Sequence, residues 1–184
     1  MLMSPSRPAP VIIVDYDPLW PRRFDQLAAV YDRVLEELHH RIEHVGSTSV
    51  PGLAAKPVID IIIVIPSMAD FALLNAALES LGYLHNGDQD VPGREVFKLK
   101  LRELMANDLG EEPWTHHLYV CPSGSKSLAQ MLFFRDYLRA HAETSRRYDE
   151  LKRGLAQKFR NDRVGYTDAK TAFVTAITDL MLEG

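Results

Sequence analysis

An apolar run at residues 58–65, interrupted by one charged side chain, is the feature that most constrains the fold. The run reads VIDIIIVI, so it is Val and Ile throughout except for Asp60. Such a run is typical of a central strand that is covered on both faces. A carboxylate in this strand is strongly destabilising unless a metal ion, a lysine, or hydroxyl and amide donors pair with it.

A turn rich in hydroxyl side chains precedes this run and supplies candidate partners for Asp60. The turn consists of Gly46, Ser47, Thr48 and Ser49. In a short helix or nest, its free backbone N–H groups would be suited to hold an anion. We therefore expect Asp60 and the turn to lie together in a binding cleft.

The turn and the strand together resemble the motifs of a known superfamily. A Gly-Ser pair, about a dozen residues and then an Asp in an apolar strand are similar to the signature of the nucleotidyltransferase fold shared with polymerase β. The fuller sequence VGSTSVPGLAAKPVIDI resembles the GrpB family of that superfamily. Members of this family stand alone or are fused to dephospho-coenzyme A kinase. The Tyr-Asp-Pro opening at residues 16–18 extends the resemblance, together with Trp20 and Phe24, which we expect to be core aromatics.

The resemblance implies a metal site with one carboxylate fewer than usual. In the superfamily, the Gly-Ser turn holds nucleotide phosphates and strand carboxylates bind two Mg²⁺ ions. Asp60 matches the first carboxylate, whereas Ile62 occupies the position of the second. Glu95, on another predicted strand, is a further candidate to supply an oxygen. Because Mg²⁺ keeps octahedral geometry, we expect at most one divalent cation, Mg²⁺ or Mn²⁺, held by Asp60, nucleotide oxygens and water with His117 as a further ligand.

A pair of histidines lies in the predicted strand at residues 116–120. Family members carry His-Leu-His in this strand, and the present chain has His117-Leu118-Tyr119. His117 and Tyr119 share one face of the strand, and His116 lies on the other. Beside Asp60, His117 would bind a metal ion or transfer a proton. The alternative is a hydrogen-bonded packing residue, and the sequence leaves both interpretations open.

Two lysines are candidates to bind phosphate. Lys56 and Lys98 resemble lysines that recur in the family, and either would contact a phosphate as a point charge or neutralise Asp60. For Lys98 the alternative is an ordinary surface position, because Lys100 lies on the same side of its strand. Lys152, in a predicted helix near the C-terminus, is a weaker candidate.

Two arginines in the sequence FRDYLR match a family motif. Arg135 and Arg139 are four residues apart and therefore share a helix face. Guanidinium groups suit phosphate oxygens, so both are candidates to bind substrate. The alternative is surface pairing, of Arg135 with Asp136 and of Arg139 with Glu143.

Charge, cysteine content and missing motifs exclude several function classes. The net charge of −4 argues against a general nucleic-acid binder. The single cysteine, Cys121, cannot form an internal disulfide or a Cys-rich zinc site, which favours a cytoplasmic location. No apolar run approaches the ~20 residues that span a bilayer, and no signal peptide is recognisable, so we expect no membrane partner. The P-loop, dinucleotide-binding, zincin and α/β-hydrolase motifs are absent.

The element pattern predicts an α/β (α+β) fold in one domain at residues 11–184, after a flexible tail at residues 1–10. Expected strands lie at residues 11–14, 41–45, 58–65, 83–85, 94–102 and 116–120. Expected helices begin at Pro21 and cover residues 69–81, 128–141 and two later segments, and an acidic loop is expected at 103–113. The predicted architecture is a small mixed sheet of the nucleotidyltransferase type flanked by helices, with a helical C-terminal part.

The expected function is the transfer of a nucleotidyl or phosphoryl group to a small acceptor, with nucleotide or another phosphorylated small molecule as partner. The alternative is a catalytically silent module that binds nucleotides or coenzyme A precursors. A third hypothesis is an interaction protein with a vestigial cleft. The isoleucine at position 62 favours the silent module over an ordinary enzyme, whereas the set Gly46, Ser47, Lys56, Asp60 and Arg135 argues against the third hypothesis.

Overall fold

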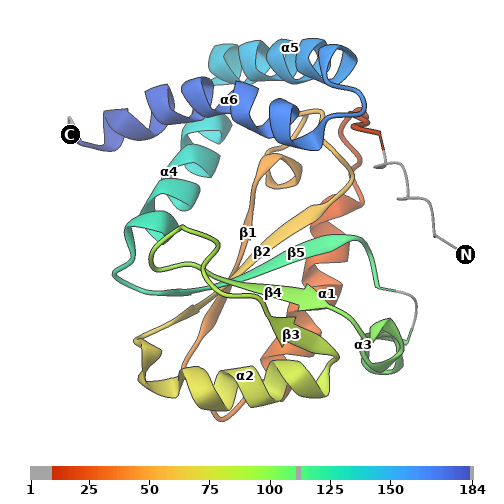
Figure 1. Ribbon diagram of the computed structural model, residues 1–184, viewed down its shortest axis with the longest axis vertical. Coiled ribbons are helices and arrows are strands. Elements are labelled where there is room, and N and C mark those ends of the chain that lie inside the picture. Colours follow the sequence, from red (N-terminus) through yellow and green to blue (C-terminus); the bar gives the residue numbers. More distant parts are fainter. Residues whose placement is uncertain (1–9, 111–112, 183–184) are drawn as a thin grey trace, which may run out of the picture.

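The computed structural model describes residues 10–110 and 113–182, and a five-stranded mixed sheet lies at its centre (Figure 1). The strands are β1 (Arg41–Val45), β2 (Ile59–Ile65), β3 (Tyr83–His85), β4 (Glu95–Leu99) and β5 (His116–Pro122). Their order across the sheet is β1-β2-β5-β4-β3. β2 and β5 are parallel, and the other neighbouring pairs are antiparallel. The predicted mixed sheet is confirmed, with the Asp60 strand paired on both sides.

Helices flank this sheet and continue beyond it. They are α1 (Trp20–Val34), α2 (Phe71–Ser80), α3 (Arg102–Leu109), α4 (Lys126–Ala140), α5 (Ala142–Lys158) and α6 (Arg163–Thr178). Pro21 occupies the first turn of α1, as the sequence predicts, because its missing N–H would have no partner there anyway. In Figure 1, α4, α5 and α6 lie together at one end of the sheet, which confirms the predicted helical C-terminal part.

The two faces of β2 are buried by different helices. Ile61 and Ile63 belong to the main core, together with Leu27 of α1 and Leu74 of α2. The alternate side chains, Ile62 and Val64, pack with Leu128 of α4. Asp60 shares the α4-facing side of the strand, because side chains alternate along it. It lies at the strand's beginning, where 27% of its side chain remains exposed.

A third apolar cluster joins the C-terminal helices to the loop that follows β1. It contains buried side chains from the loop and from α4, α5 and α6: Val50, Leu53, Leu138, Tyr148 and Ile177. This packing brings the C-terminal helices close to the 46–49 turn. Within the described residues, no helix is both long and apolar enough to cross a lipid bilayer.

Three local predictions were wrong. Residues 11–14 form one isolated bridge, Val14 with Ala55, because this segment pairs with the loop before β2 rather than with an edge of the sheet. The strand expected at 94–102 ends at Leu99, and most of the expected acidic loop at 103–113 is helix α3. Met105 is fully buried in the core and Leu109 packs against it, and these contacts stabilise a helix half of whose residues are polar. The predicted tail lies almost entirely outside the described residues, as do positions 111–112 of the loop.

Candidate functional site

The structure places Asp60 directly against the Gly46 turn, as the sequence predicts. Val45, the last residue of β1, is paired with Asp60 across the antiparallel ladder. The backbone then turns at Gly46, with φ 70° and ψ −173°, into a short 3₁₀ helix, Ser47–Ser49. A Cβ atom at Gly46 would overlap the Oδ2 atom of Asp60, so only glycine allows this approach. The turn and the carboxylate therefore form one unit.

His117 is the direct partner of Asp60. The two residues are paired across the parallel β2–β5 ladder, and the His117 Nδ1 and Asp60 Oδ1 atoms are 2.8 Å apart. Because a carboxylate accepts hydrogen bonds, Nδ1 carries the proton in this contact and Nε2 is the nitrogen left for another partner. The side chains are partly exposed, 43% for His117 and 27% for Asp60. This pair has the geometry of a general base and the group that orients it.

His116 has a structural role on the opposite side of β5. The Tyr83 hydroxyl hydrogen-bonds to its Nε2 atom, and its Nδ1 atom donates to the Trp114 carbonyl at 2.5 Å. The Tyr83 hydroxyl also bonds to the Tyr31 hydroxyl at 2.6 Å, which extends this chain into the core. Burial lowers the pKa of His116 to about 4, so the ring is neutral at pH 7. His116 is thus the weaker candidate, in agreement with its expected orientation.

The protein ligands available to a metal ion are few. Within the described residues, no group of three His, Cys, Asp or Glu side chains is arranged to hold a metal. Ile62 is fully buried against α4, and Glu95 hydrogen-bonds to His85 Nε2 at 2.6 Å. Asp60 and His117 therefore fit a single divalent cation whose other ligands come from substrate and water. The number and identity of bound ions stay predictions.

Two lysines, Lys56 and Lys170, lie beside the ring of Tyr166 and within electrostatic range of Asp60. Lys56 Nζ lies 5.4 Å from the ring centroid of Tyr166, and Lys170 Nζ lies 4.6 Å from the same centroid. Burial and the charge of Lys56 lower the pKa of Lys170 to about 8, against the opposing effect of Asp60. Burial first, and then Arg163, lower the pKa of Lys56, again opposed by Asp60. These interactions place both ammonium groups within electrostatic reach of the carboxylate.

Sequence reasoning missed Lys170 and Tyr166. Both belong to α6, in a part of the chain that carries none of the family motifs quoted from the sequence. Their spacing of four residues puts them on one helix face, but this signal is common on solvated helices. Only the packing of α6 near the Asp60 turn distinguishes them from surface residues.

Lys152 is buried rather than directed at a ligand. It is 2% exposed, its Nζ donates to the Ala54 carbonyl, and it lies 4.7 Å from the ring centroid of Tyr148. Burial lowers the pKa of Lys152 to about 7. The Tyr148 hydroxyl in turn lies beside the Ser47 side chain. Lys152 and Tyr148 therefore contact the chain at Ala54 and Ser47, on either side of the 50–53 segment. Their role is structural, and phosphate would be contacted by other side chains.

The remaining hydroxyl groups of the turn are used internally. Thr48 Oγ1 donates to the Val58 carbonyl at 3.3 Å and lies 3.0 Å from His44 Nε2. Because the Thr48 hydroxyl proton is used in the bond to Val58, His44 Nε2 donates the second bond, from a ring that is neutral since burial lowers its pKa to about 4. Ser49 Oγ donates to the Gly46 carbonyl at 2.6 Å. The hydroxyls of Thr48 and Ser49 thus shape the turn, whose contribution to a ligand would come from its backbone and from Ser47.

Arg135 and Arg139 brace this turn from α4. Arg135 Nη1 donates to Glu43 at 2.7 Å and to the His44 carbonyl at 3.1 Å, while its Nε donates to Asp136 at 2.7 Å. Arg139 donates to the Ser49 carbonyl from Nη2 at 2.8 Å and from Nε at 3.1 Å. The predicted pairing of Arg135 with Asp136 is present, whereas Arg139 approaches Asp136 rather than Glu143. These contacts favour a positioning role, and phosphate binding by either arginine stays a prediction.

Cavities adjoin the site on different sides. One of about 370 Å³ is lined by Asp60, Gly46 and Tyr119, with Arg94 and Gln130 nearby. The Arg94 guanidinium lies 5.0 Å from the Tyr119 ring centroid, and its buried Nε has no hydrogen-bond partner among the described residues. A second cavity, of about 520 Å³, is lined by His117 and Lys98. Lys56 does not line this cavity, so the two candidate lysines lie in different places.

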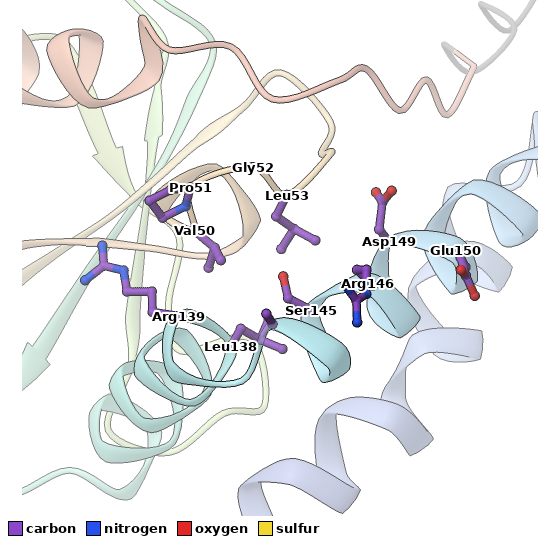
Figure 2. A pocket seen from close by; sticks show the side chains of 11 residues that line it. Val50, Pro51, Gly52, Leu53, Leu138, Arg139, Ser145, Arg146, Asp149 and Glu150 are labelled. Atoms are coloured by element: carbon purple, nitrogen blue, oxygen red, sulfur yellow. The ribbon is translucent and has the colours of Figure 1, made fainter.

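A cavity of about 620 Å³ lies apart from Asp60, between the 50–53 loop and helices α4 and α5 (Figure 2). Figure 2 shows Leu53 of the loop and Leu138 of α4 on two walls of the cavity, with Arg146 and Glu150 following along α5. The Arg139 side chain links this cavity to the turn through the Ser49 carbonyl. Its lining contains no member of the Asp60–His117 pair.

Comparisons with known proteins identify the family. The GrpB protein family model matches residues 10–180. The glutamate-rich protein GrpB of Alkalihalophilus pseudofirmus is 34% identical over 172 residues, which cover 93% of this chain and 95% of that protein. The crystal structure of conserved protein GrpB from Enterococcus faecalis has a TM-score of 0.78 and 30% identity, covering 94% of this chain and 98% of that chain. A dephospho-CoA kinase of Mycolicibacterium paratuberculosis is 41% identical over 81 residues, which are 41% of this chain and 19% of the kinase. The chain therefore belongs to the GrpB family.

Proposed function

We propose that the Asp60 cleft binds the phosphates of a nucleotide and transfers a nucleotidyl or phosphoryl group to a small acceptor, assisted by one divalent cation. The observation that carries this proposal is the Asp60–His117 pair held against the Gly46 turn, with Lys56 and Lys170 within electrostatic range of Asp60. Cations beside the backbone N–H groups of a turn suit a phosphate chain, and a carboxylate beside them suits a bridging metal.

An anionic ligand would stabilise the charged forms of both lysines. Burial lowers the pKa of both lysines, to about 8 for Lys170, so part of the charge of Lys170 is lost at pH 8. A phosphate between Lys56 and Lys170 would raise both pKa values again, because an opposite charge favours the ammonium form. Phosphate binding at this position should therefore take up protons at pH 8 and above.

A divalent cation would be held by Asp60 and His117, and it would neutralise charge on the phosphate oxygens. The mixed oxygen and nitrogen ligands favour Mn²⁺ or Zn²⁺ over Mg²⁺. Because one ion cannot hold both the attacking and the leaving oxygens, turnover should be slow compared with two-metal enzymes.

The transfer step uses the Asp60–His117 pair as general base. Because Nδ1 is bonded to Asp60, Nε2 serves either the cation or the proton, and in this step the cation would be left to Asp60, phosphate oxygens and water. The acceptor hydroxyl oxygen attacks the phosphorus, its proton passes to His117 Nε2, and Asp60 stabilises the resulting imidazolium. The bond between phosphorus and the bridging oxygen breaks, and the electron pair leaves with that oxygen on the departing phosphate or pyrophosphate. Positioning supplies most of the remaining rate enhancement.

A second candidate function is a silent nucleotide- or coenzyme A precursor-binding module. The observation that favours it is Ile62, which fills the position of the second metal carboxylate and is fully buried. In that case the lysines and the turn would bind the same phosphates without turnover.

Calorimetry and a transfer assay test the proposal. The protein is titrated with ATP, GTP, CTP and UTP with and without Mg²⁺ or Mn²⁺, and at about 100 times its Kd a ligand should stabilise the fold by about 2.7 kcal/mol. Lys170→Met should weaken nucleotide binding at least tenfold, whereas Lys126→Met, an exposed lysine at the start of α4, should not. Asp60→Asn should abolish metal dependence and leave the fold intact.

The outcomes separate the two candidate functions. Release of pyrophosphate or phosphate that depends on Asp60 supports the enzyme. Nucleotide binding without any turnover, under all metal conditions, supports the silent module. If none of the four nucleotides binds, or if Lys170→Met and Lys126→Met behave alike, the phosphate site is wrong.

A further inference from the structure

A basic groove lies on the far side of His117 from Lys56, Lys170 and the 46–49 turn. Its volume is about 520 Å³, and it is formed by β4, β5 and the beginning of α3. Its nitrogen-bearing lining side chains include Lys98, Lys100, Arg102 and His117. Among the described residues, no aspartate or glutamate lines it. Since the whole chain carries a net charge of −4, this local excess of cations is a distinct feature of the surface.

The two groove lysines have no counterion in the described part of the chain. Lys98 and Lys100 are exposed, and neither forms an ion pair with a described residue. The carboxylate of the same strand, Glu95, is instead paired with His85 at 2.6 Å. Arg102 Nη2 donates to the Pro113 carbonyl, which fixes the guanidinium beside the groove. The positive potential of the groove is therefore available to an anion from solution.

The groove is continuous with the proposed catalytic pair. His117 lines the groove and also hydrogen-bonds to Asp60 through Nδ1. Tyr119, two residues further along β5, lines both the groove and the cavity beside Asp60. A molecule in the groove can thus contact the side chain that would accept a proton, while nucleotide phosphates occupy the side of Lys56 and Lys170.

We propose that this groove binds the acceptor and that the acceptor is a small molecule with a phosphomonoester group. A phosphomonoester carries nearly two negative charges at neutral pH, which the ammonium groups of Lys98 and Lys100 would balance. The volume of the groove suits a small molecule, and the net negative charge of the chain disfavours a long polyanion. This assignment rests on the proposed transfer reaction for its role, but the binding site can be tested by itself.

The test uses glycerol 3-phosphate as probe and glycerol as its uncharged counterpart. Both are titrated into the full chain while backbone amide signals of residues 95–99 and 116–119 are followed by NMR. Glycerol 3-phosphate should shift these signals and glycerol should not. The double variant Lys98→Glu/Lys100→Glu should bind the probe at least tenfold more weakly, which corresponds to about 1.4 kcal/mol. The double variant Lys126→Glu/Arg147→Glu, which makes the same charge change at exposed positions outside the groove, should bind the probe as the wild type does.

Nucleotide titrations of the same variants distinguish this inference from the proposed function. Lys98→Glu/Lys100→Glu should weaken the binding of glycerol 3-phosphate more than the binding of nucleotide. Lys170→Met should weaken nucleotide binding more. If glycerol 3-phosphate binds in the groove while no nucleotide binds, the groove is confirmed as a phosphomonoester site and the proposed function is wrong. The groove assignment is overturned if the probe causes no shifts, if Lys170→Met alone removes its binding, or if a short single-stranded RNA binds the groove more tightly than the probe does.

Discussion

Replacement of Gly46 by alanine would test whether the 46–49 turn and Asp60 act as one unit. The added Cβ would overlap Asp60 Oδ2 and would lie 2.9 Å from Asp60 Cγ and 3.0 Å from Asp60 Cβ. Non-bonded carbons prefer about 3.5–4.0 Å, so the Asp60 side chain or the turn must move. Either movement separates the carboxylate from His117 or displaces the phosphate-binding backbone. We expect the variant to lose nucleotide binding and to be less stable.

The expected loss of stability can be worked from these contacts. The backbone of Gly46, at φ 70° and ψ −173°, lies in a region that is almost restricted to glycine, and a side chain there costs about 1–3 kcal/mol. Displacing Asp60 also removes its charged hydrogen bond to His117. A buried bond of this kind contributes ~1.5–3 kcal/mol, and this one contributes less because both partners are partly exposed. Together these terms predict a decrease of roughly 2–4 kcal/mol in the free energy of unfolding.

Gly52→Ala provides the matched control. Gly52 also has a positive φ, 78°, but a Cβ there meets no atom within 4 Å. This variant should lose only about 1–2 kcal/mol, from backbone strain, and should keep its nucleotide affinity. Urea denaturation measures both free energies, and calorimetry measures binding. Equal losses of stability in the two variants, or unchanged nucleotide binding in Gly46→Ala, would refute the close coupling of the turn to Asp60.

Two further predictions concern buried groups outside the cleft. Because burial lowers the pKa of Lys152 to about 7, the unfolded chain binds a proton between pH 7 and pH 10 that the folded chain does not, and stability should rise with pH in that range by at most about 1.4 kcal/mol per unit. Lys152→Met should flatten this slope in urea denaturation at pH 7–9, and identical slopes would contradict the assignment. Tyr83→Phe should cost about 1–3 kcal/mol, since it leaves both the Tyr31 hydroxyl and His116 Nε2 without their partner. Tyr31→Phe, which keeps the Tyr83–His116 bond, should show a smaller decrease in melting temperature.

Local patterns in the sequence were sufficient for the elements around the catalytic pair. The apolar run with Asp60 predicted β2, which begins only one residue later than expected, and β1 and β3 match their predicted bounds. Period-two alternation also assigned His117 and His116 to opposite faces of β5, where hydrogen bonds to Asp60 and to Tyr83 now place them. These features depend on neighbours in the chain, so their signal is contained in short windows of sequence.

Elements stabilised by distant contacts were predicted less well. Half of the residues of helix α3 are polar, and the packing of Met105 and Leu109 with the core stabilises it. The bridge between Val14 and Ala55 likewise depends on a loop far along the chain. In both cases tertiary packing overrides weak local preference, which no window of sequence can show.

The sequence by itself determined the family motifs, the Asp60 strand, the glycine turn against it and the isoleucine that replaces the second acid. Only the tertiary structure decided which basic side chains lie within electrostatic range of that carboxylate. It placed Lys170 of α6 beside Lys56, turned Arg135 toward Glu43 and the His44 carbonyl, and put Lys98 in a separate groove on the far side of His117. The physical reason is that a charged side chain shows the same local pattern on a solvated surface as in a site. Its function depends on the packing of whole helices against the sheet, which brings together residues that are remote in the chain.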